Sequence, residues 1–236
     1  MKIVTYNVHK CRGMDRRTSV QRIAQVLDDI DADIVALQEV LSSEQGKGGQ
    51  LEALASELKL NAVFGRTRSL YSNGYGNAIL SRWPIHNSEN LDISWRQRER
   101  RGCLKADIET PRGTLSVLNI HLGTSYFERR HQVRRLLSLK HFAESAAGPR
   151  VLIGDFNEWT RGLTSRMLAE KFESLNLETH IQRRKSYPGF LPVLHLDHIY
   201  FEKPLCIQSA QLIRTRLSKV ASDHLPLAAV FGWENG

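Results

Sequence analysis

The chain has 236 residues, of which 41% are hydrophobic and 25% charged, so it can bury a substantial core and lacks the composition of a disordered protein. Its three cysteines, Cys11, Cys103 and Cys206, are widely spaced, which argues against a disulfide framework and a cysteine-based metal site. A formal net charge of +8 favours a polyanionic partner, either nucleic acid or an anionic membrane face, although it also fits a basic protein whose arginines are simply solvated.

The sequence carries no recognisable targeting segment. No apolar stretch reaches the roughly 18–20 residues that a transmembrane helix needs. The first residues, MKIVTYNV, are typical of a strand and not of the apolar region of a signal peptide. Because there is also no internal repeat, low-complexity tract or linker, we expect a single domain over residues 1–236, located in the cytoplasm.

The first quarter of the chain alternates strands with helices. Residues 3–8 have strand composition, and residues 18–30 place apolar side chains at helical spacing behind Thr18 or Ser19 as the N-cap. An apolar strand over 33–39 then ends in a carboxylate, and a second helix is predicted at about 48–59.

The remainder is richer in strands. The turn at 111–113 predicts that 106–108 and 115–121 pair as a hairpin. The predicted strands are 61–64, 76–80, 105–108, 115–121, 151–155, 195–201, 207–213 and 225–231, and the predicted helices are 128–145, which is basic, and 163–173. Since strands and helices mix without a strict βαβ rhythm, we expect an α/β sandwich of mixed or mainly antiparallel sheets with outer helices.

Polar motifs stand at the ends of several of these strands. Asn7 and Glu39 each close an apolar strand, and their oxygens suit a hard cation such as Mg²⁺, although a single Glu after a strand is more often solvated or a cap. In Gly154-Asp155-Phe156-Asn157, Asp155 and Asn157 can point to the same side; an ordinary turn explains this motif equally well.

Histidines and a further aspartate complete the set. His224, in Ser222-Asp223-His224, can exchange a proton near neutral pH, and Asp197 on another predicted strand can orient its imidazole. His121, at the end of LSVLNIH, offers another proton donor or phosphate contact. Each residue has a structural explanation, but together they favour hydrolysis of a phosphate ester with a divalent cation.

The motifs also carry a family resemblance. TYNVHK, ALQEV, GYGNAILSRWPI, VLNIHLG, IGDFNEW, LDHIY and SDHLPL, in that order, resemble the endonuclease/exonuclease/phosphatase superfamily over residues 3 to 231. Its members include pancreatic-type deoxyribonuclease, exonuclease III, abasic-site endonucleases, neutral sphingomyelinases and inositol-polyphosphate 5-phosphatases. The resemblance implies a four-layered α/β sandwich, in which helices flank two packed mixed β-sheets, with a metal site at one edge.

The resemblance also implies roles for individual residues. Asn7, Glu39 and Asp223 match the metal-binding positions, with Glu39 as the principal ligand of Mg²⁺ or Mn²⁺. The catalytic set is His121, Asp155, Asn157, Asp197 and His224. In it Asp155 and Asn157 position the water and the phosphate, and His224 serves as general base or phosphate stabiliser with Asp197 orienting it. His121 matches a histidine proposed as general acid or phosphate ligand in the deoxyribonuclease and sphingomyelinase branches.

Two departures bear on the branch. Abasic-site nucleases tend to carry an acidic residue where this chain has His9, and a tyrosine where it has His121. Both differences weaken assignment to that branch. The chain also has little room for substrate-specific insertions.

The arginines are the main clue to the substrate. Guanidinium groups bind phosphates bidentately and stack on bases, so the arginines of 96–101 and of the basic helix suit a nucleic-acid backbone, although many arginines simply lie on solvated faces. The residues assigned to substrate binding are Asn77, Arg98, Arg101 and Arg130.

The leading hypothesis is a metal-dependent DNA or RNA nuclease. The alternatives are a phosphodiesterase or phosphatase acting on a phospholipid or phosphorylated small molecule, with an anionic lipid surface as partner, and a non-catalytic nucleic-acid-binding protein. No obligate protein partner is evident.

Overall fold

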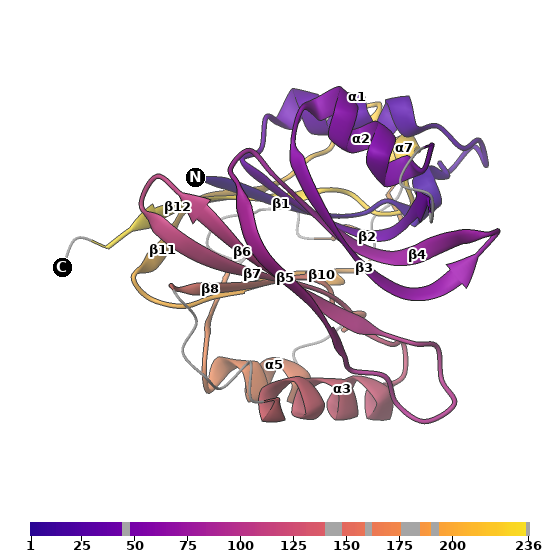
Figure 1. Cartoon of the computed structure of the whole chain (residues 1–236). Helices are drawn as coiled ribbons and strands as arrows, with labels where there is room; N and C mark the ends of the chain where they lie inside the picture. Colours follow the sequence, from indigo (N-terminus) through magenta and orange to yellow (C-terminus); the bar gives the residue numbers. More distant parts are fainter. Residues whose placement is uncertain (44–47, 140–147, 159–161, 176–184, 190–193, 235–236) are drawn as a thin grey trace.

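Two six-stranded sheets form the centre of the molecule (Figure 1). The computed structural model describes residues 1–43, 48–139, 148–158, 162–175, 185–189 and 194–234. In the first sheet the strand order is β11 (Leu205–Leu212), β12 (Leu227–Trp233), β1 (Lys2–Asn7), β2 (Ile34–Ser43), β4 (Asn73–Ser81) and β3 (Asn61–Leu70). In the second it is β5 (Ile85–Asp92), β6 (Gly102–Thr110), β7 (Gly113–His121), β8 (Arg150–Asp155), β10 (Asp197–Phe201) and β9 (Glu173–Ser174).

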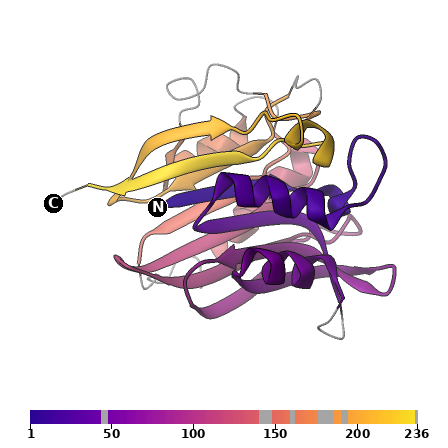
Figure 2. The ribbon, with the colours of Figure 1, turned by 90° about the horizontal axis from the view of Figure 1, so that it is seen from above.

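Helices cover the outer face of each sheet. On the first sheet lie α1 (Val20–Ile30) and α2 (Gln50–Leu58), which run side by side in Figure 2, together with the short α7 (Ser218–Ala221). On the second lie α3 (Tyr126–Ser138) and α5 (Leu163–Ala169) (Figure 1). Both sheets mix parallel and antiparallel pairs, so the predicted four-layered α/β sandwich is confirmed.

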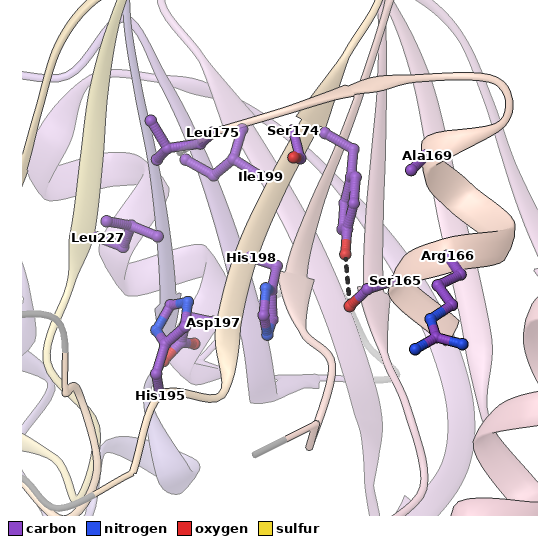
Figure 3. Close-up of a pocket in the computed structure, with 11 residues that line it drawn as sticks. Ser165, Arg166, Ala169, Ser174, Leu175, His195, Asp197, His198, Ile199 and Leu227 are labelled. Atoms are coloured by element: carbon purple, nitrogen blue, oxygen red, sulfur yellow. Dashed lines mark hydrogen bonds between the residues drawn. The ribbon is translucent and has the colours of Figure 1, made fainter. Parts of the chain in front are cut away.

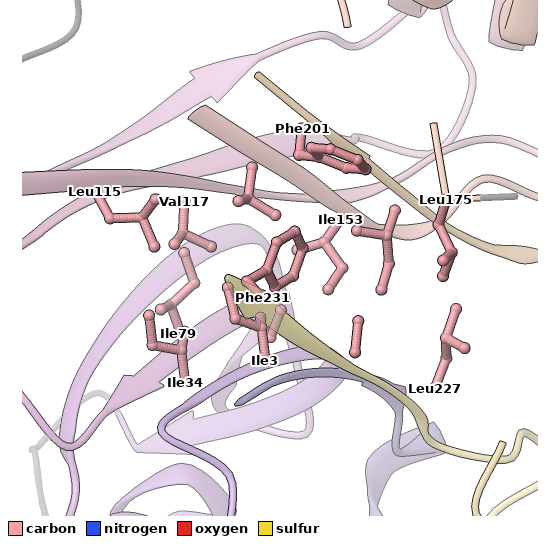
Figure 4. Close-up of a cluster of buried hydrophobic side chains, with 14 of the residues drawn as sticks. Ile3, Ile34, Ile79, Leu115, Val117, Ile153, Leu175, Phe201, Leu227 and Phe231 are labelled. Atoms are coloured by element: carbon pink, nitrogen blue, oxygen red, sulfur yellow. The ribbon is translucent and has the colours of Figure 1, made fainter. Parts of the chain in front are cut away.

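Three apolar clusters hold the layers together. The largest fills the space between the sheets, where Ile3 and Phe231 of the first sheet face Val117 and Ile153 of the second (Figure 4). A second cluster lies between the first sheet and α1 and α2, and a third lies under α3 and α5 around the fully buried Phe156. Burial of apolar area in three separate seams is the main source of the fold's stability.

The predicted elements largely match. Ser19 is the N-cap of α1, where its side chain accepts a hydrogen bond from the backbone N–H of Arg22, and residues 103–110 pair with 113–120 as the expected hairpin. The helix predicted over 128–145 is wrong in its extent: α3 begins at Tyr126 and ends at Ser138, with Leu139 already extended, while residues 140–147 lie outside the described residues. The sequence pattern also missed β5, since most of this edge strand is exposed and polar.

Strand direction brings the polar motifs to one edge of the sandwich. β7 runs parallel to β8, so His121 and Asp155 end neighbouring strands at the same level. β1 runs parallel to β2, and Asn7 ends β1 opposite Gln38, while β2 continues to Ser43. In the second sheet, Asp155 is the register partner of both His121 and Asp197. Directly opposed residues place their side chains on the same face, so these three side chains converge.

No helix among the described residues is long and apolar enough to cross a membrane.

Candidate active site

Asp155 lies at the centre of the convergent side chains. It follows Gly154 at the end of β8, is 1% exposed, and its Oδ1 accepts a hydrogen bond from the backbone N–H of Asn157 at 2.9 Å. Gly154 has φ +148°, and a Cβ there would lie 1.9 Å from the carbonyl oxygen of Ile120. Only glycine lets β8 approach β7 this closely, so the close packing of these two strands explains why a glycine precedes Asp155.

Three nitrogen groups surround the other carboxylate oxygen. Asp155 Oδ2 lies 3.1 Å from Nδ2 of Asn7, which donates to it, and 3.6 Å from Nε2 of both His121 and His224. The four side chains come from β1, β7, β8 and the segment after α7. The structure therefore brings Asn7, His121, Asp155 and His224 together, as their positions at strand ends had predicted.

His224 is held by a second carboxylate. Its Nδ1 lies 3.2 Å from Oδ2 of Asp197, and the same oxygen accepts a hydrogen bond from the Ser186 hydroxyl at 2.6 Å. Burial by itself disfavours the imidazolium, but the charges of Asp197 and Asp155 outweigh it and raise the pKa of His224 to about 10. His224 is thus a buried cation at neutral pH, and Asp197 lies where the prediction placed it.

His121 is in the opposite electrostatic situation. Its Nδ1 lies 3.1 Å from Nη1 of Arg101. Burial and then the charge of Arg101 lower the pKa of His121 to about 4, against the opposing influence of Asp155 and Glu39. The site therefore contains one charged and one neutral imidazole on either side of one carboxylate oxygen.

Glu39 reaches the site through a bulge in β2. The register of β2 against β4 shifts between Leu37 and Val40, and Glu39 has φ +57°. A bulge re-aims one side chain without interrupting the strand. Gln38 accordingly remains buried between the sheets, where its Nε2 donates to Oδ1 of Asn119 at 2.7 Å, whereas Glu39 turns toward Asn7.

Glu39 is ionised across the neutral range. Its Oε2 accepts a hydrogen bond from Nζ of Lys10 at 2.8 Å, and its Oε1 lies 3.4 Å from Nδ2 of Asn7. Burial opposes the charge, but His121 and Lys10 outweigh burial and lower the pKa of Glu39 to about 2. A carboxylate that keeps its charge in a partly buried setting is suited to a cation.

The donor set around Glu39 fits a hydrated hard cation. Among the described residues, no three His, Cys, Asp or Glu side chains form a closed cluster that could cage an ion. Mg²⁺ typically takes only one or two protein carboxylates and retains several waters. Glu39 supplies one such carboxylate, while the Asn7 amide turns its Nδ2 toward Glu39 and its Oδ1 accepts a hydrogen bond from the backbone N–H of His9 at 3.1 Å. Asp223, whose Oδ2 lies 3.7 Å from Nδ1 of His9, is a further carboxylate beside that histidine.

Of the remaining predicted residues, Asn157 also lies in the site but supports its backbone. It has φ +49°, and its Nδ2 donates to the carbonyl of Leu122 at 2.9 Å, tying the end of β8 to the end of β7. Asn77 is 3% exposed and donates to the carbonyls of Gly102 at 3.1 Å and Asn119 at 3.4 Å, between the sheets. A substrate-binding role for Asn77 stays a prediction.

The three predicted substrate arginines occupy different settings. Arg98 is exposed in the loop between β5 and β6, and Arg130 lies half-buried on α3. The side chain of Arg101 is only 9% exposed and contacts His121 and Glu99. Their substrate contacts likewise stay predictions.

Several residues of the site carried no signal in the sequence. Lys10, Ser186 and Glu99 contact Glu39, Asp197 and Arg101 respectively, but each lies in a polar segment without periodicity. Tyr187 packs on His224 with ring centroids 5.0 Å apart. Only tertiary contacts identify them.

A cavity of about 360 Å³ lies next to Asp197 (Figure 3). His195 and His198 line it from the β10 side and Arg166 from α5. Asp197 belongs to both the cavity and the site, whereas Asp155, His121 and Glu39 do not line the cavity.

A family model described as the Endonuclease/Exonuclease/phosphatase family matches residues 4–224, so the chain belongs to this family. Enzymes of this family are hydrolases that act on phosphoester bonds and generally use divalent metal ions.

The relatives match nearly the whole chain. YbhP of Escherichia coli K12, described as uncharacterized, is 29% identical over 242 residues, covering 97% of this chain and 94% of YbhP. A functionally unknown conserved protein of Enterococcus faecalis V583 has a similar structure, with a TM-score of 0.81, 22% identity and coverage of 99% of this chain and 100% of that one. The mannosyl-6-phosphatase of Bacteroides thetaiotaomicron VPI-5482 matches with a TM-score of 0.79, 17% identity and the same coverage. These two structures share the fold.

Proposed function

We propose that this protein is a divalent-metal-dependent phosphodiester hydrolase that cuts DNA or RNA by in-line attack of water on phosphorus. The observation that carries the proposal is the arrangement around Asp155 Oδ2, which lies within 3.6 Å of nitrogen groups from Asn7, His121 and His224. A carboxylate surrounded by fixed donors can accept a proton from water while the donors stabilise charge on the phosphate.

Asp155 is the general base in this mechanism. His224 already carries a proton at neutral pH, because its pKa is about 10, so it cannot take another from water. The attacking water gives its proton to Asp155 as its oxygen bonds to phosphorus, the ester P–O bond breaks, and the leaving oxygen takes up a proton from solvent. Of the two roles predicted for His224, phosphate stabilisation is therefore the one that the electrostatics support.

Two donors of different charge serve the phosphate. His224 supplies a positive charge held by Asp197, and His121 supplies a neutral N–H. Loss of one preorganised donor of this kind typically lowers the rate by roughly 10²–10³.

Glu39, Asn7 and Asp223 are the residues that would hold Mg²⁺ or Mn²⁺. When bound, such a cation offsets negative charge on the phosphate and leaving oxygens. The pKa of Glu39 is lowered to about 2, so its carboxylate carries a negative charge throughout the neutral range.

The nucleic-acid part of the proposal is supported by the surroundings of the site. Arg96, Arg98 and Arg100 are exposed on the loop that leads to Arg101, and Arg134 is exposed on α3, which begins five residues after His121. At the start of α3, Tyr126 is 44% and Phe127 65% exposed. Exposed aromatic rings beside arginines suit stacking of bases along a bound phosphate backbone.

A second candidate function rests on the same two aromatic residues. Exposed Tyr126 and Phe127 beside arginines also suit an anionic lipid surface, where rings enter the headgroup region. The protein would then hydrolyse a phospholipid headgroup. A phosphorylated small molecule is a further substrate class, since a mannosyl-6-phosphatase shares this fold.

One substrate panel separates these functions. Purified protein with Mg²⁺, Mn²⁺ or a chelator is assayed against plasmid, single- and double-stranded oligonucleotides, abasic DNA, sphingomyelin vesicles, inositol phosphates and sugar phosphates. We expect metal-dependent cleavage of nucleic acid, with binding that weakens steeply between 50 and 200 mM salt because counterions are released. Lipid or sugar-phosphate turnover without nuclease activity would reject the nucleic-acid assignment, and no turnover of any phosphoester would reject the catalytic one.

A further inference from the structure

Arg101 lies directly behind His121. It is the last loop residue before β6, its side chain is 9% exposed, and Nη1 lies 3.1 Å from Nδ1 of His121. The loop backbone is fixed at the same point: Arg101 N donates to the Ser94 hydroxyl at 3.1 Å, and Ile93 N donates to the carbonyl of Arg101 at 3.1 Å. The position of the guanidinium is therefore fixed by the fold.

The chemistry of arginine decides how this contact is made. A guanidinium has donors and no acceptor, and it stays protonated in proteins. Nδ1 of His121 must then present its lone pair, which leaves the ring proton on Nε2. That nitrogen is the one that lies 3.6 Å from Oδ2 of Asp155.

His224 has the opposite arrangement. Its Nδ1 lies 3.2 Å from a carboxylate oxygen of Asp197, which can only accept, so Nδ1 carries a proton there. Its Nε2 lies at the same 3.6 Å from Asp155 Oδ2. The Nε2 atoms of both imidazoles therefore lie at the same distance from one oxygen of Asp155. The Nδ1 atom of His224 contacts an anion, Asp197, whereas the Nδ1 atom of His121 contacts a cation, Arg101.

A chain of ionic contacts holds Arg101 in place. Nη2 of Arg101 donates to Oε2 of Glu99 at 2.9 Å, and the other oxygen of Glu99 lies 3.1 Å from Nη2 of Arg68. The Arg68 guanidinium lies over the ring of Tyr75, 4.7 Å from its centroid. The contact behind His121 therefore spans the β3–β4 pair and the loop before β6, and it is a built feature of the fold.

We propose that Arg101 is a positioning residue, which acts on the reaction only through His121 by fixing it as a neutral imidazole with its proton on Nε2. This inference rests on the proposed function, because it assigns His121 as a neutral hydrogen-bond donor to the phosphate and not as a proton-delivering imidazolium. It also gives Arg101 a role other than substrate binding.

The consequence for the reaction concerns Asp155. A charged His121 would place a second imidazolium, in addition to that of His224, against the same oxygen of Asp155. A neutral His121 donates from Nε2 without adding that second positive charge. The low pKa of His121, about 4, agrees with this reading, since burial and Arg101 both disfavour the imidazolium.

The first test observes the ring directly. Two-bond ¹H–¹⁵N correlation spectra of the full-length protein report which imidazole nitrogen carries hydrogen, and His121→Gln assigns the signals. We expect wild-type His121 to show a protonated Nε2 and a lone pair on Nδ1 at pH 7, and Arg101→Met to lose that preference. A wild-type ring with hydrogen on Nδ1, or a fully protonated ring, overturns the proposal.

The second test separates positioning from substrate binding. In Arg101→Met we expect kcat to fall at least about tenfold, toward the roughly 10²–10³ that losing a donor costs, with KM changed less than about threefold. Arg101→Lys keeps a charged donor and should restore the Nε2 tautomer and part of kcat, and it also serves if the methionine variant fails to fold. Arg112→Met is the matched control for charge, because exposed Arg112 directly precedes β7 and lies about 30 Å along the strand from His121.

The outcomes are distinct from those of the substrate panel. A raised KM with unchanged kcat in Arg101→Met means that Arg101 binds substrate and overturns the proposal. Equal losses in Arg101→Met and Arg112→Met mean that only net charge matters and also overturn it. If no phosphoester is hydrolysed by the wild type, the proposed function fails, while the spectra still decide the tautomer of His121.

Discussion

Replacing Asp197 with asparagine should move the alkaline limb of the pH–rate profile to lower pH. Asp197 is 0% exposed and lies 3.2 Å from Nδ1 of His224, and it is the strongest of the charges that raise the pKa of His224 from 6.5 to about 10. That rise corresponds to about 5 kcal/mol in favour of the charged imidazole. Because an opposite charge in contact contributes roughly 1–3 pH units, the limb should fall from near pH 10 to between about 7 and 9.

The assay is hydrolysis of bis(p-nitrophenyl) phosphate from pH 6 to 10.5 at saturating Mg²⁺, with the His224 ring proton followed by NMR in the same samples. Ser186→Ala is the control, since it removes the 2.6 Å hydrogen bond to Asp197 but keeps its charge, and we expect it to move the limb much less. An alkaline limb that is identical in Asp197→Asn and wild type would refute the assignment of His224 as the catalytic cation.

Three further predictions concern the metal residue, the backbone and the linkage of charge to stability. Glu39→Gln should lower kcat/KM at least about 100-fold and weaken Mn²⁺ binding in calorimetry, with an unchanged circular dichroism spectrum; normal metal affinity would contradict the role of Glu39. Gly154→Ala should lower the free energy of unfolding by about 1–3 kcal/mol or more in urea titrations, because its Cβ would lie 1.9 Å from the Ile120 carbonyl at a φ of +148°; an unchanged midpoint would speak against this close approach. The His224 pKa is raised on folding, so its stabilisation is complete below about pH 6.5 and lost as pH rises through about 10; the Tm difference between wild type and His224→Gln should shrink over that window.

The predictable parts of the site are those set by a single strand and its end. Asn7, His121 and Asp155 were found because an apolar run stops directly at or before a polar side chain, and the parallel pairing of β7 with β8 then places His121 and Asp155 at one level. Asp197 begins β10 and His224 precedes β12; they were found as an imidazole and a carboxylate that can orient it, and they are in contact. Local sequence is sufficient here because strand period and strand direction decide which edge a terminal side chain reaches.

Other features depend on contacts between segments that are far apart. The bulge that separates Gln38 from Glu39 requires the register of β2 against β4. The burial of Asn77 between the sheets depends on the approach of the β6 and β7 backbones. Strand β5 escaped prediction because an exposed edge strand shows no apolar periodicity.

By itself, the sequence determined the fold class and the chemical inventory at the strand ends, since apolar spacing and terminal polar residues are local properties of the chain. Only the tertiary structure decided the charge states. His121 and His224 look alike in the sequence, but Arg101 lies behind one and Asp197 behind the other. A buried imidazole responds to the charge in contact with its far nitrogen, and that neighbour is chosen by folding.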